Sequence, residues 1–217
     1  KTTTMYAILN EIDRFTRNVI TVQDPIEAVL PTASQIEINP KADITFAKTL
    51  RSVLRQDPDV ICVGEIRDEE TAEIALRAAQ TGHLVLATIH CDSNKAAIVR
   101  LMDLGISPLL ISSGLSLVLS QRLVRRLCEY CKEPAELSQN LIHDFQRIGL
   151  DHSNIFQPTG CKKCEGTGYL GRTAVCDILA VTEQLKADIN NSKVSAAKLK
   201  TDDKIKPHLR REGLKKV

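Results

Sequence analysis

The first half of the chain alternates short apolar runs with amphipathic segments. The runs cover residues 18–23, 59–64 and 83–88, and the first two have the length and composition of a strand buried on both faces. Residues 69–80, between the last two runs, carry apolar side chains at helical spacing, and Thr81-Gly82 ends this predicted helix. Strand, helix and strand in this order predict a parallel βαβ unit, whose ligands bind at the carboxyl ends of the strands.

A functional side chain follows each of the two later strands. Glu65 comes directly after the run 59–64, and His90 lies just beyond the run 83–88, which His83 begins. Because the carboxyl ends of parallel strands share one edge of the sheet, we expect Glu65 and His90 at that edge. Taken alone, both histidines are typical of hydrogen-bonded residues at strand ends. We interpret Glu65 as the candidate functional group.

Two carboxylates follow the earlier strand at residues 18–23. Asp24 and Glu27 are separated by Pro25, which fixes the backbone of the turn. As an isolated signal, this pattern favours a solvated turn with an aspartate cap. Beside a nucleotide, one of the two carboxylates would instead act as a base for a water molecule, because phosphoryl transfer needs a positioned nucleophile.

The remaining pattern predicts further elements. Residues 33–39 alternate apolar and polar side chains and predict an edge strand or a hairpin arm. The pattern predicts helices over residues 46–56, 93–104 and 109–127, a strand over 174–181, and a polar, basic helical region from 182 onward.

Two arginines one turn apart, Arg51 and Arg55, share a face of the helix predicted over residues 46–56. Arginines in such positions usually lie in solvent. The alternative is a pair that points across a subunit boundary at a phosphate.

The chain begins with Lys1-Thr2 directly ahead of a helical pattern. This is what remains when a G-x-x-x-x-G-K-[ST] loop is cut just before its lysine. In that loop, backbone N–H groups cradle phosphates, the lysine reaches the outer phosphates and the hydroxyl binds Mg²⁺. We therefore expect that the chain is a fragment and that the glycines of the loop are missing.

Four of the seven cysteines form two C-x-x-C pairs. Each pair places two thiolates on one turn, and two such turns complete the closed tetrahedral site of structural Zn²⁺. The predicted ligands are Cys128, Cys131, Cys161 and Cys164. With no open coordination position, this zinc would be structural. We interpret Cys62, Cys91 and Cys176 as small core residues.

Three glycines fall within residues 166–172, just after the second cysteine pair. No strand precedes this segment and no helix clearly follows it, so the pattern favours a tight turn over a phosphate-binding loop.

Composition excludes several classes of protein. The 217 residues are enough for one sizeable domain with a small module attached. The net charge is +2, aromatic residues make up 3% and tryptophan is absent, so general nucleic-acid binding is disfavoured. The longest apolar stretch, residues 109–119, is too short and too interrupted to span a bilayer. Paired cysteines without a signal peptide indicate a reduced, cytosolic protein.

Taken together, the motifs resemble the ATPase family that drives type II secretion and type IV pilus assembly. Lys1-Thr2 is similar to the end of the Walker A loop of that family, and residues 21–27 (TVQDPIE) are similar to its aspartate box. Residues 54–68 (LRQDPDVICVGEIRD) resemble its Walker B segment, and residues 81–90 (TGHLVLATIH) resemble its histidine box. The metal module of its assembly and secretion members is resembled by residues 121–128 (QRLVRRLC), the two C-x-x-C pairs and residues 168–172 (GYLGR).

The resemblance implies ATP, Mg²⁺ and structural Zn²⁺ as cofactors. Lys1 would contact the β and γ phosphates, and Thr2 would hold Mg²⁺. Glu65 would act on Mg²⁺ and its waters, and Glu27 would activate the attacking water. Asp24 would lie among the nucleotide-binding residues.

Four further residues acquire roles from the resemblance. His83 and His90 would sense the γ-phosphate or link the site to its neighbour. Arg51 and Arg55 would stabilise charge in trans, since an arginine finger has a large effect on the rate where it occurs. The family works as a ring, commonly a hexamer, that passes ATP-driven motion to an inner-membrane platform. The resemblance thus implies a cytoplasmic homo-oligomer held peripherally at the inner membrane by its partners.

The implied fold is α/β: a RecA-like P-loop NTPase core with a mostly parallel sheet, a tetracysteine zinc-binding insert and a small helical C-terminal region. We predict the core at residues 1–127, the zinc module at 128–172 and the C-terminal region at 173–217, which we expect to be truncated.

The sequence departs from the family pattern in two places. Gln23 occupies a position that is usually acidic, so one negative charge near the metal is absent. The glycine loop is also missing, so the fragment itself is expected to bind ATP poorly. Two alternatives stay open: a degenerate, non-hydrolysing scaffold of the same family and, less favoured, a nucleic-acid-binding zinc protein.

Overall fold

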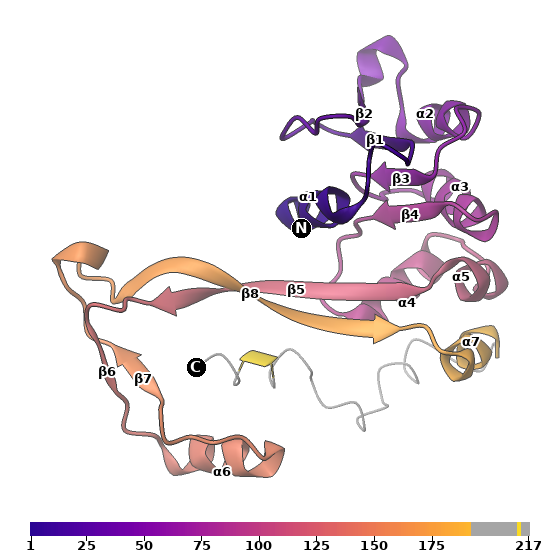
Figure 1. Ribbon diagram of the computed structural model, residues 1–217. Helices are drawn as coiled ribbons and strands as arrows, with labels where there is room; N and C mark the ends of the chain where they lie inside the picture. Colours follow the sequence, from indigo (N-terminus) through magenta and orange to yellow (C-terminus); the bar gives the residue numbers. More distant parts are fainter. Residues whose placement is uncertain (192–211, 214–217) are drawn as a thin grey trace. The chain divides into compact units, whose positions relative to one another are not determined.

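The computed structural model describes residues 1–191 and 212–213 (Figure 1). The described chain divides into two compact units. The first contains Lys1–Val118 and the segment that begins at Leu179, and the second contains Leu119–Ile178. No helix among the described residues has the length and the apolar character needed to cross a membrane.

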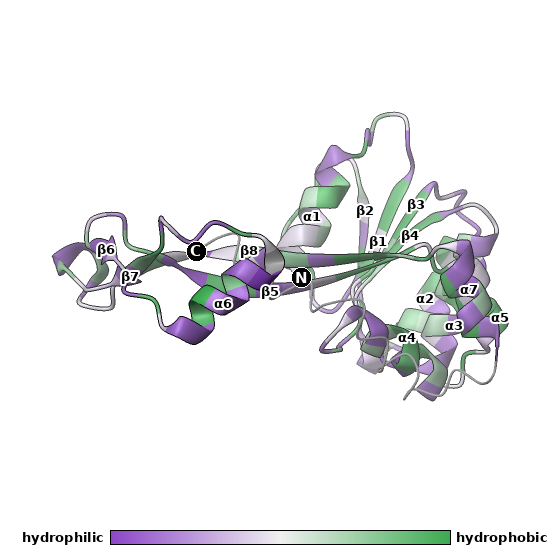
Figure 2. Cartoon of the chain, turned by 90° about the horizontal axis from the view of Figure 1, so that it is seen from below, coloured by the Kyte–Doolittle hydropathy of each residue, from purple (hydrophilic) through white to green (hydrophobic). Residues whose placement is uncertain are grey.

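A four-stranded parallel sheet forms the centre of the first unit. Its strands are β1 (Val19–Gln23), β2 (Ser34–Glu37), β3 (Val60–Val63) and β4 (Leu84–Ala87), in the spatial order β2-β1-β3-β4. Every residue of β1 and β3 is buried, whereas the edge strands β2 and β4 are partly exposed. The two continuous apolar runs therefore became the two inner strands, as expected of strands covered on both faces. Figure 2 shows the hydrophobic colouring of these strands.

Seven α-helices and short 3₁₀ turns are described along the chain. The elements of the first unit are α1 (Thr2–Glu11), η1 (Pro40–Ala42), α2 (Phe46–Val53), α3 (Glu69–Gln80), α4 (Asn94–Asp103), α5 (Pro108–Gly114) and α7 (Glu183–Asn190). Side-chain oxygens cap five of these helices, because each accepts a hydrogen bond from an otherwise unpaired backbone N–H of the first turn. The capping residues are Thr45, Asp68, Ser93, Ser107 and Thr182.

Three apolar clusters make up the core of this unit. One surrounds Ile61 and Val63 of β3 with residues of β1 and α2, and another packs α1 residue Leu9 against Val19 and Cys62. The third joins α3, α4, α5 and α7, and its fully buried members include Ile98, Ile111 and Ile189. The chain thus returns to the first unit after the second unit, because α7 completes this third cluster.

The helix predicted over residues 109–127 is wrong. Helix α5 ends at Gly114, and strand β5 covers Leu117–Leu127. Gly114 is confined, since a Cβ there would lie 2.8 Å from the carbonyl oxygen of Leu76. Beyond it, leucines recur at odd positions, which share one face of a strand, and the strand pairs with the distant β8 (Tyr169–Ala180). Pairing with a distant strand therefore determined the secondary structure of a segment whose sequence pattern is also compatible with a helix.

The second unit consists of small antiparallel elements. Strands β5 and β8 form a two-stranded sheet and run in opposite directions in Figure 1. Strand β6 (Lys132–Pro134) pairs with β7 (Phe156–Pro158), α6 (Gln139–Ile148) lies between them in the sequence, and η2 (Lys162–Cys164) precedes β8.

The strand predicted over residues 174–181 is confirmed. Residues 174–180 belong to strand β8, which begins earlier, at Tyr169, and pairs with β5. Helix α7 follows, as predicted from residue 182 onward, and packs in the first unit. The rest of that predicted helical region, apart from residues 212–213, lies outside the described residues.

Candidate active site and metal centre

Asp24 and Glu65 leave neighbouring strands at the same edge of the sheet. The register that pairs Val22 with Val63 brings the two acidic residues to the same level, one residue past the end of β1 and two past the end of β3. Gly64 makes the approach of the strands possible, since a Cβ there would lie 3.2 Å from the carbonyl oxygen of Val22 and 3.3 Å from the Cα of Gln23. The carboxyl edge therefore carries two carboxylate-bearing loops close together.

The loop after β3 is also tied to the end of β4. The Thr88 hydroxyl donates to the carbonyl oxygen of Gly64 at 2.7 Å, and the backbone N–H of Ile66 donates to the carbonyl oxygen of Thr88 at 2.8 Å. These bonds bracket Glu65. His90 follows β4, and its Nε2 lies 3.7 Å from Oε2 of Glu65. The structure thus brings together the two residues that the βαβ pattern assigns to this edge.

Arg67 joins the two carboxylates. Its guanidinium forms an ion pair with Oε1 of Glu65 and lies 3.6 Å from Oδ2 of Asp24. The Arg67 hydrogen bond lowers the pKa of the Glu65 carboxyl, and the charges of Arg67, His90 and Lys1 act in the same direction against its burial. Glu65 is therefore ionised at neutral pH. The sequence analysis missed Arg67, because a basic residue two positions past a strand end has no distinctive pattern.

The beginning of the chain reaches the same edge. The Lys1 ammonium donates to the carbonyl oxygen of Ile89 at 2.8 Å, next to His90, and the Thr2 hydroxyl donates to Oε1 of Glu27 at 3.0 Å. Lys1 is also the N-cap of α1, so the N-terminal end of that helix faces the cluster. A helix N-terminus with a lysine, a hydroxyl and nearby carboxylates suits a phosphate accompanied by a cation.

A buried polar network holds the loop that carries Glu27. Gln23 is 4% exposed, and its amide donates to the Tyr6 hydroxyl at 3.0 Å and accepts from the Gln35 amide at 3.2 Å. The Tyr6 hydroxyl donates to the carbonyl oxygen of Ala28 at 3.0 Å and accepts from the Ala28 N–H at 3.2 Å. The uncharged Gln23 therefore serves as the centre of this network, beneath the loop. The sequence analysis missed Tyr6 and Gln35 because hydrogen-bond partners far apart in sequence leave no local signal.

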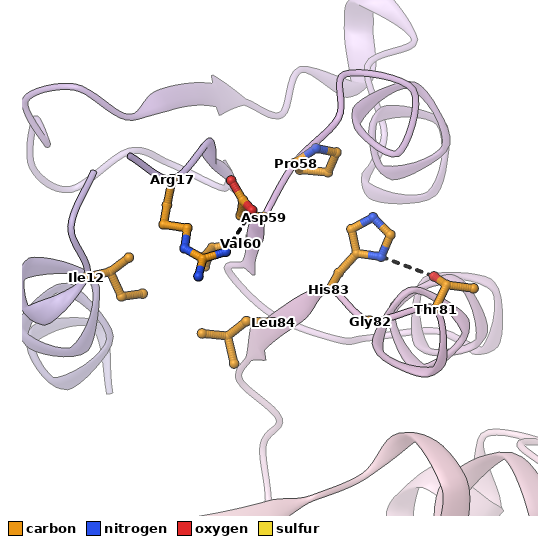
Figure 3. A pocket seen from close by; sticks show the side chains of 9 residues that line it. All are labelled: Ile12, Arg17, Pro58, Asp59, Val60, Thr81, Gly82, His83 and Leu84. Carbon is orange, nitrogen blue, oxygen red and sulfur yellow. Dashed lines mark hydrogen bonds and ion pairs between the residues drawn. The ribbon is translucent and has the colours of Figure 1, made fainter. Parts of the chain in front are cut away.

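His83 lies at the opposite edge of the sheet from Glu65. It precedes β4, at the level where the chain enters β3 at Asp59. Its Nδ1 lies 3.1 Å from the Thr81 hydroxyl (Figure 3) and 2.9 Å from the carbonyl oxygen of Ala78. The strands between the two edges span roughly 20 Å. A ligand phosphate beside Glu65 is therefore out of reach of His83 in the same chain. Of the two roles implied for His83, the link between the site and its neighbour stays a prediction.

A cavity of about 380 Å³ adjoins His83 at this edge. Its lining includes Arg17 and Asp59, which form an ion pair at 3.1 Å (Figure 3). The cavity thus lies away from the carboxylate cluster.

Arg51 and Arg55 are exposed and lie outside the cluster around Glu65. Arg51 forms an ion pair with Glu70 at 2.5 Å, which connects α2 to the first turn of α3. Arg55 follows the end of α2, and its backbone N–H donates to the carbonyl oxygen of Ser52. Their role in trans stays a prediction.

The four paired cysteines converge in the second unit. The sulfur atoms of Cys128, Cys131, Cys161 and Cys164 all lie within 4.8 Å of one another. Three of the separations are 3.8–3.9 Å. Four thiolates around a tetrahedral zinc with Zn–S bonds of about 2.3 Å have sulfurs about 3.8 Å apart. The geometry therefore fits one zinc ion.

Backbone donors surround one of these sulfurs. The N–H groups of Cys161 and Gly168 both donate to Sγ of Cys164 at 3.2 Å. Burial raises the pKa of the Cys164 thiol, but these donors and the neighbouring thiols outweigh burial and bring it down to about 6. Gly166 and Gly168 lie in the turn that presents the N–H of Gly168, in agreement with the predicted turn, whereas Gly171 lies in strand β8.

The other three cysteines are apart from this cluster. Cys62 is fully buried, and burial raises the pKa of its thiol to about 12, as expected of a core residue. Cys91 and Cys176 are only half-buried, so the interpretation as core residues holds for Cys62 alone.

Comparisons with known proteins agree with the geometry. Residues 1–217 match the family model described as type II/IV secretion system protein. The chain is 46% identical over 217 residues to the type II secretion system ATPase E of Vibrio cholerae and 44% identical over 220 residues to the type II secretion system protein E of Pseudomonas aeruginosa. In both cases it aligns along its whole length but covers 43% of the relative.

Solved structures show the same fold. The pilus retraction motor PilT with bound ADP superposes with a TM-score of 0.63 at 28% identity, over 89% of this chain and 47% of that protein. The ATPase DotB of Legionella pneumophila superposes with a TM-score of 0.61 at 21% identity, over 100% of this chain and 49% of that protein. The α/β fold with its parallel sheet is therefore that of these ATPases.

Proposed function

Because the chain belongs to the type II/IV secretion system protein family, we propose that it forms the nucleotide-hydrolysing part of an ATPase that powers type II secretion or type IV pilus assembly. The observation that carries the proposal is the meeting of Lys1, Thr2, Glu27, Glu65 and His90 at one edge of the sheet. These groups come from four separate segments. Relatives named as secretion ATPases and a structural neighbour with bound ADP support the same assignment.

The residues at this edge suit ATP and Mg²⁺. Lys1 would contact the outer phosphates as a point charge, and the N-terminal end of α1 would add its dipole. The hydroxyl and carboxylate oxygens of Thr2 and Glu65 are of the type that Mg²⁺ prefers. When bound, the ion supplies neutralisation of the charge on the phosphates. The Asp24 carboxylate would add a further negative charge beside the cation.

Glu27 is the candidate base for the attacking water. Its carboxylate is held in place by the Thr2 hydroxyl, and its loop is fixed by the Tyr6 network. Glu65 is engaged by Arg67 and faces His90, so it is less available to accept a proton from water. We assign proton transfer from the attacking water to Glu27, and we assign positioning of the phosphate groups to Glu65 and His90.

The second unit would hold one structural Zn²⁺ through its four cysteine thiolates. The separations of the four sulfurs support this assignment, since they match those of thiolates around one tetrahedral zinc ion. All four coordination positions are filled by protein, so the ion would have no part in hydrolysis.

The active form would be a cytoplasmic ring, most simply a hexamer, working on an inner-membrane platform. A ring places the surface of one subunit against the nucleotide edge of the next. Exposed Arg51 and Arg55 would then act in trans, and His83 would contribute through its neighbour rather than through the nucleotide of its own subunit.

The test is phosphate release by the full-length protein and by its Glu65→Gln variant at matched zinc content. We expect hydrolysis that falls by at least about 100-fold in the variant. The matched control is Glu73→Gln, because Glu73 lies on α3 and pairs with Arg77 at 2.7 Å, away from the site. Bound nucleotide without hydrolysis in any of the three proteins would favour a non-hydrolysing scaffold.

A further inference from the structure

Arg67 occupies the position between the two acidic loops of the carboxyl edge. Glu65 and Asp24 are both within ion-pair distance of its guanidinium. Two carboxylates on neighbouring strands repel each other unless a cation lies between them. The planar, permanently charged guanidinium meets this need, because its fork of N–H donors addresses two carboxylates at once.

A divalent cation would compete for the same carboxylate oxygens. Oε1 of Glu65 pairs with Arg67, and Oε2 faces His90 at 3.7 Å. Both oxygens of Glu65 are therefore engaged by nitrogen groups of the protein. Mg²⁺ and its waters need oxygen ligands that are free to face it. Occupation by Arg67 and occupation by the cation therefore oppose each other.

Arg67 has room to leave. Its side chain is 60% exposed, whereas that of Glu65 is 16% exposed. The arginine extends from the loop between β3 and α3 towards solvent, so a change of rotamer alone would release the carboxylates. The fixed partner is Glu65, whose backbone is held between the Thr88 hydrogen bonds.

We propose that Arg67 is a stand-in for the divalent cation: it neutralises Asp24 and Glu65 while the site is empty, and the Mg²⁺–nucleotide complex displaces it. This inference rests on the proposed function. Arg67 is a positioning residue in this scheme, because it keeps the two acidic loops together and sets how much Mg²⁺ is needed to occupy the site.

The experiment measures binding rather than turnover. A fluorescent ATP analogue is titrated into the full-length protein over a series of Mg²⁺ concentrations, for wild type, Arg67→Gln and Arg67→Lys. Arg77→Gln is the matched control, since Arg77 is equally exposed and pairs with Glu73 on the outer face of α3. Circular dichroism melting verifies that each variant is folded.

Removal of the competing charge lowers the Mg²⁺ concentration at half-saturation by roughly three- to tenfold in Arg67→Gln, the range of one or two exposed ion pairs. Arg67→Lys falls between wild type and Arg67→Gln, because it keeps the charge but loses the fork of donors. Arg77→Gln stays near wild type. An unchanged Mg²⁺ requirement in Arg67→Gln would overturn the proposal. A higher requirement would also overturn it, because Arg67 would then be holding the carboxylates ready for the cation.

A second titration separates this inference from the proposed function. Mn²⁺ binding to the same proteins without nucleotide, followed by electron paramagnetic resonance, reports on the carboxylates alone. Tighter Mn²⁺ binding in Arg67→Gln supports the stand-in role even if no protein binds nucleotide, an outcome that would count against the ATPase. Equal Mn²⁺ binding in wild type and Arg67→Gln contradicts the stand-in role, whatever the nucleotide result.

Discussion

The two compact units of this chain are stabilised by different means. The first has three apolar clusters around a sheet whose inner strands are fully buried. In the described part of the second unit, the large buried apolar side chains are few: Phe145, Ile155 and Val175. Its remaining buried hydrophobic positions are Cys128 and Cys164.

The difference follows from size. A unit of about sixty residues buries too little apolar surface to be more than marginally stable, and metals commonly supply what is missing. The first unit can be stable through burial alone, whereas the proposed zinc ion would supply what the second unit lacks. The same chain would then combine a folding unit held by hydrophobic burial with one held by metal ligation.

The largest expected effect is loss of the second unit on removal of zinc. Cys164→Ala, or treatment with a strong chelator, should unfold that unit, because structural zinc contributes about 10–16 kcal/mol of apparent binding free energy to folding. Limited proteolysis should cut within residues 119–178 and spare the first unit. The control is Cys176→Ser, a half-buried cysteine apart from the cluster. If Cys164→Ala melted like wild type, the contrast between the units would be wrong.

A core truncation tests the other side of the comparison. Ile61→Ala removes a fully buried side chain from the central strand β3 and should lower the free energy of unfolding of the first unit by about 2–5 kcal/mol. Urea unfolding measures the change. Ile8→Ala serves as the control, since Ile8 is 40% exposed on α1 and should cost less than about 0.5 kcal/mol. Equal losses in both variants would argue against a core centred on the sheet.

A smaller effect is expected in the polar network beneath the Glu27 loop. Tyr6→Phe removes the hydroxyl that accepts from the Ala28 N–H and the Gln23 amide. Leaving these donors without their partner should cost about 1–3 kcal/mol in urea unfolding and should lower the rate of phosphate release. Tyr130→Phe is the matched control, because that ring is 67% exposed. Full activity in Tyr6→Phe would mean that the network does not position Glu27.

The smallest effect concerns the Glu65–Arg67 pair. The folded-state pKa of Glu65 is lowered, so the pair stabilises the fold above the unfolded-state pKa of glutamate, and this contribution disappears as the pH falls through the folded-state pKa. Arg67→Gln should therefore lose at most about 1 kcal/mol at pH 7. Urea unfolding at a series of pH values should show the difference from wild type shrinking below about pH 4. A difference that grew in acid would reverse the assignment.

Much of the first unit could be predicted from the sequence. The inner strands were evident because strands covered on both faces are continuously apolar, and the predicted helix at 69–80 coincides with α3. The carboxyl-edge position of Glu65 and His90 followed from the chirality and direction of a βαβ unit. The grouping of the four paired cysteines could be predicted because the spacing of two thiols on one turn is a local property.

What could not be predicted depends on contacts between distant residues. The segment 117–127 has both helical and alternating character, and only its pairing with β8 selects the strand. Arg67 bridges two loops that meet through the register of β1 and β3.

The spacing of the two acidic loops depends on the absence of a Cβ atom at Gly64. A larger residue there would push β1 away from β3 at the point where Asp24 and Glu65 follow the strands. The distance between the two acidic loops would then increase. At Gly82, by contrast, the space around a new Cβ is empty and only the backbone angle, with φ of +98°, resists change. A substitution of Gly64 would therefore change the distance between the carboxylates proposed to bind the cation, whereas a substitution of Gly82 would strain only the backbone of a turn.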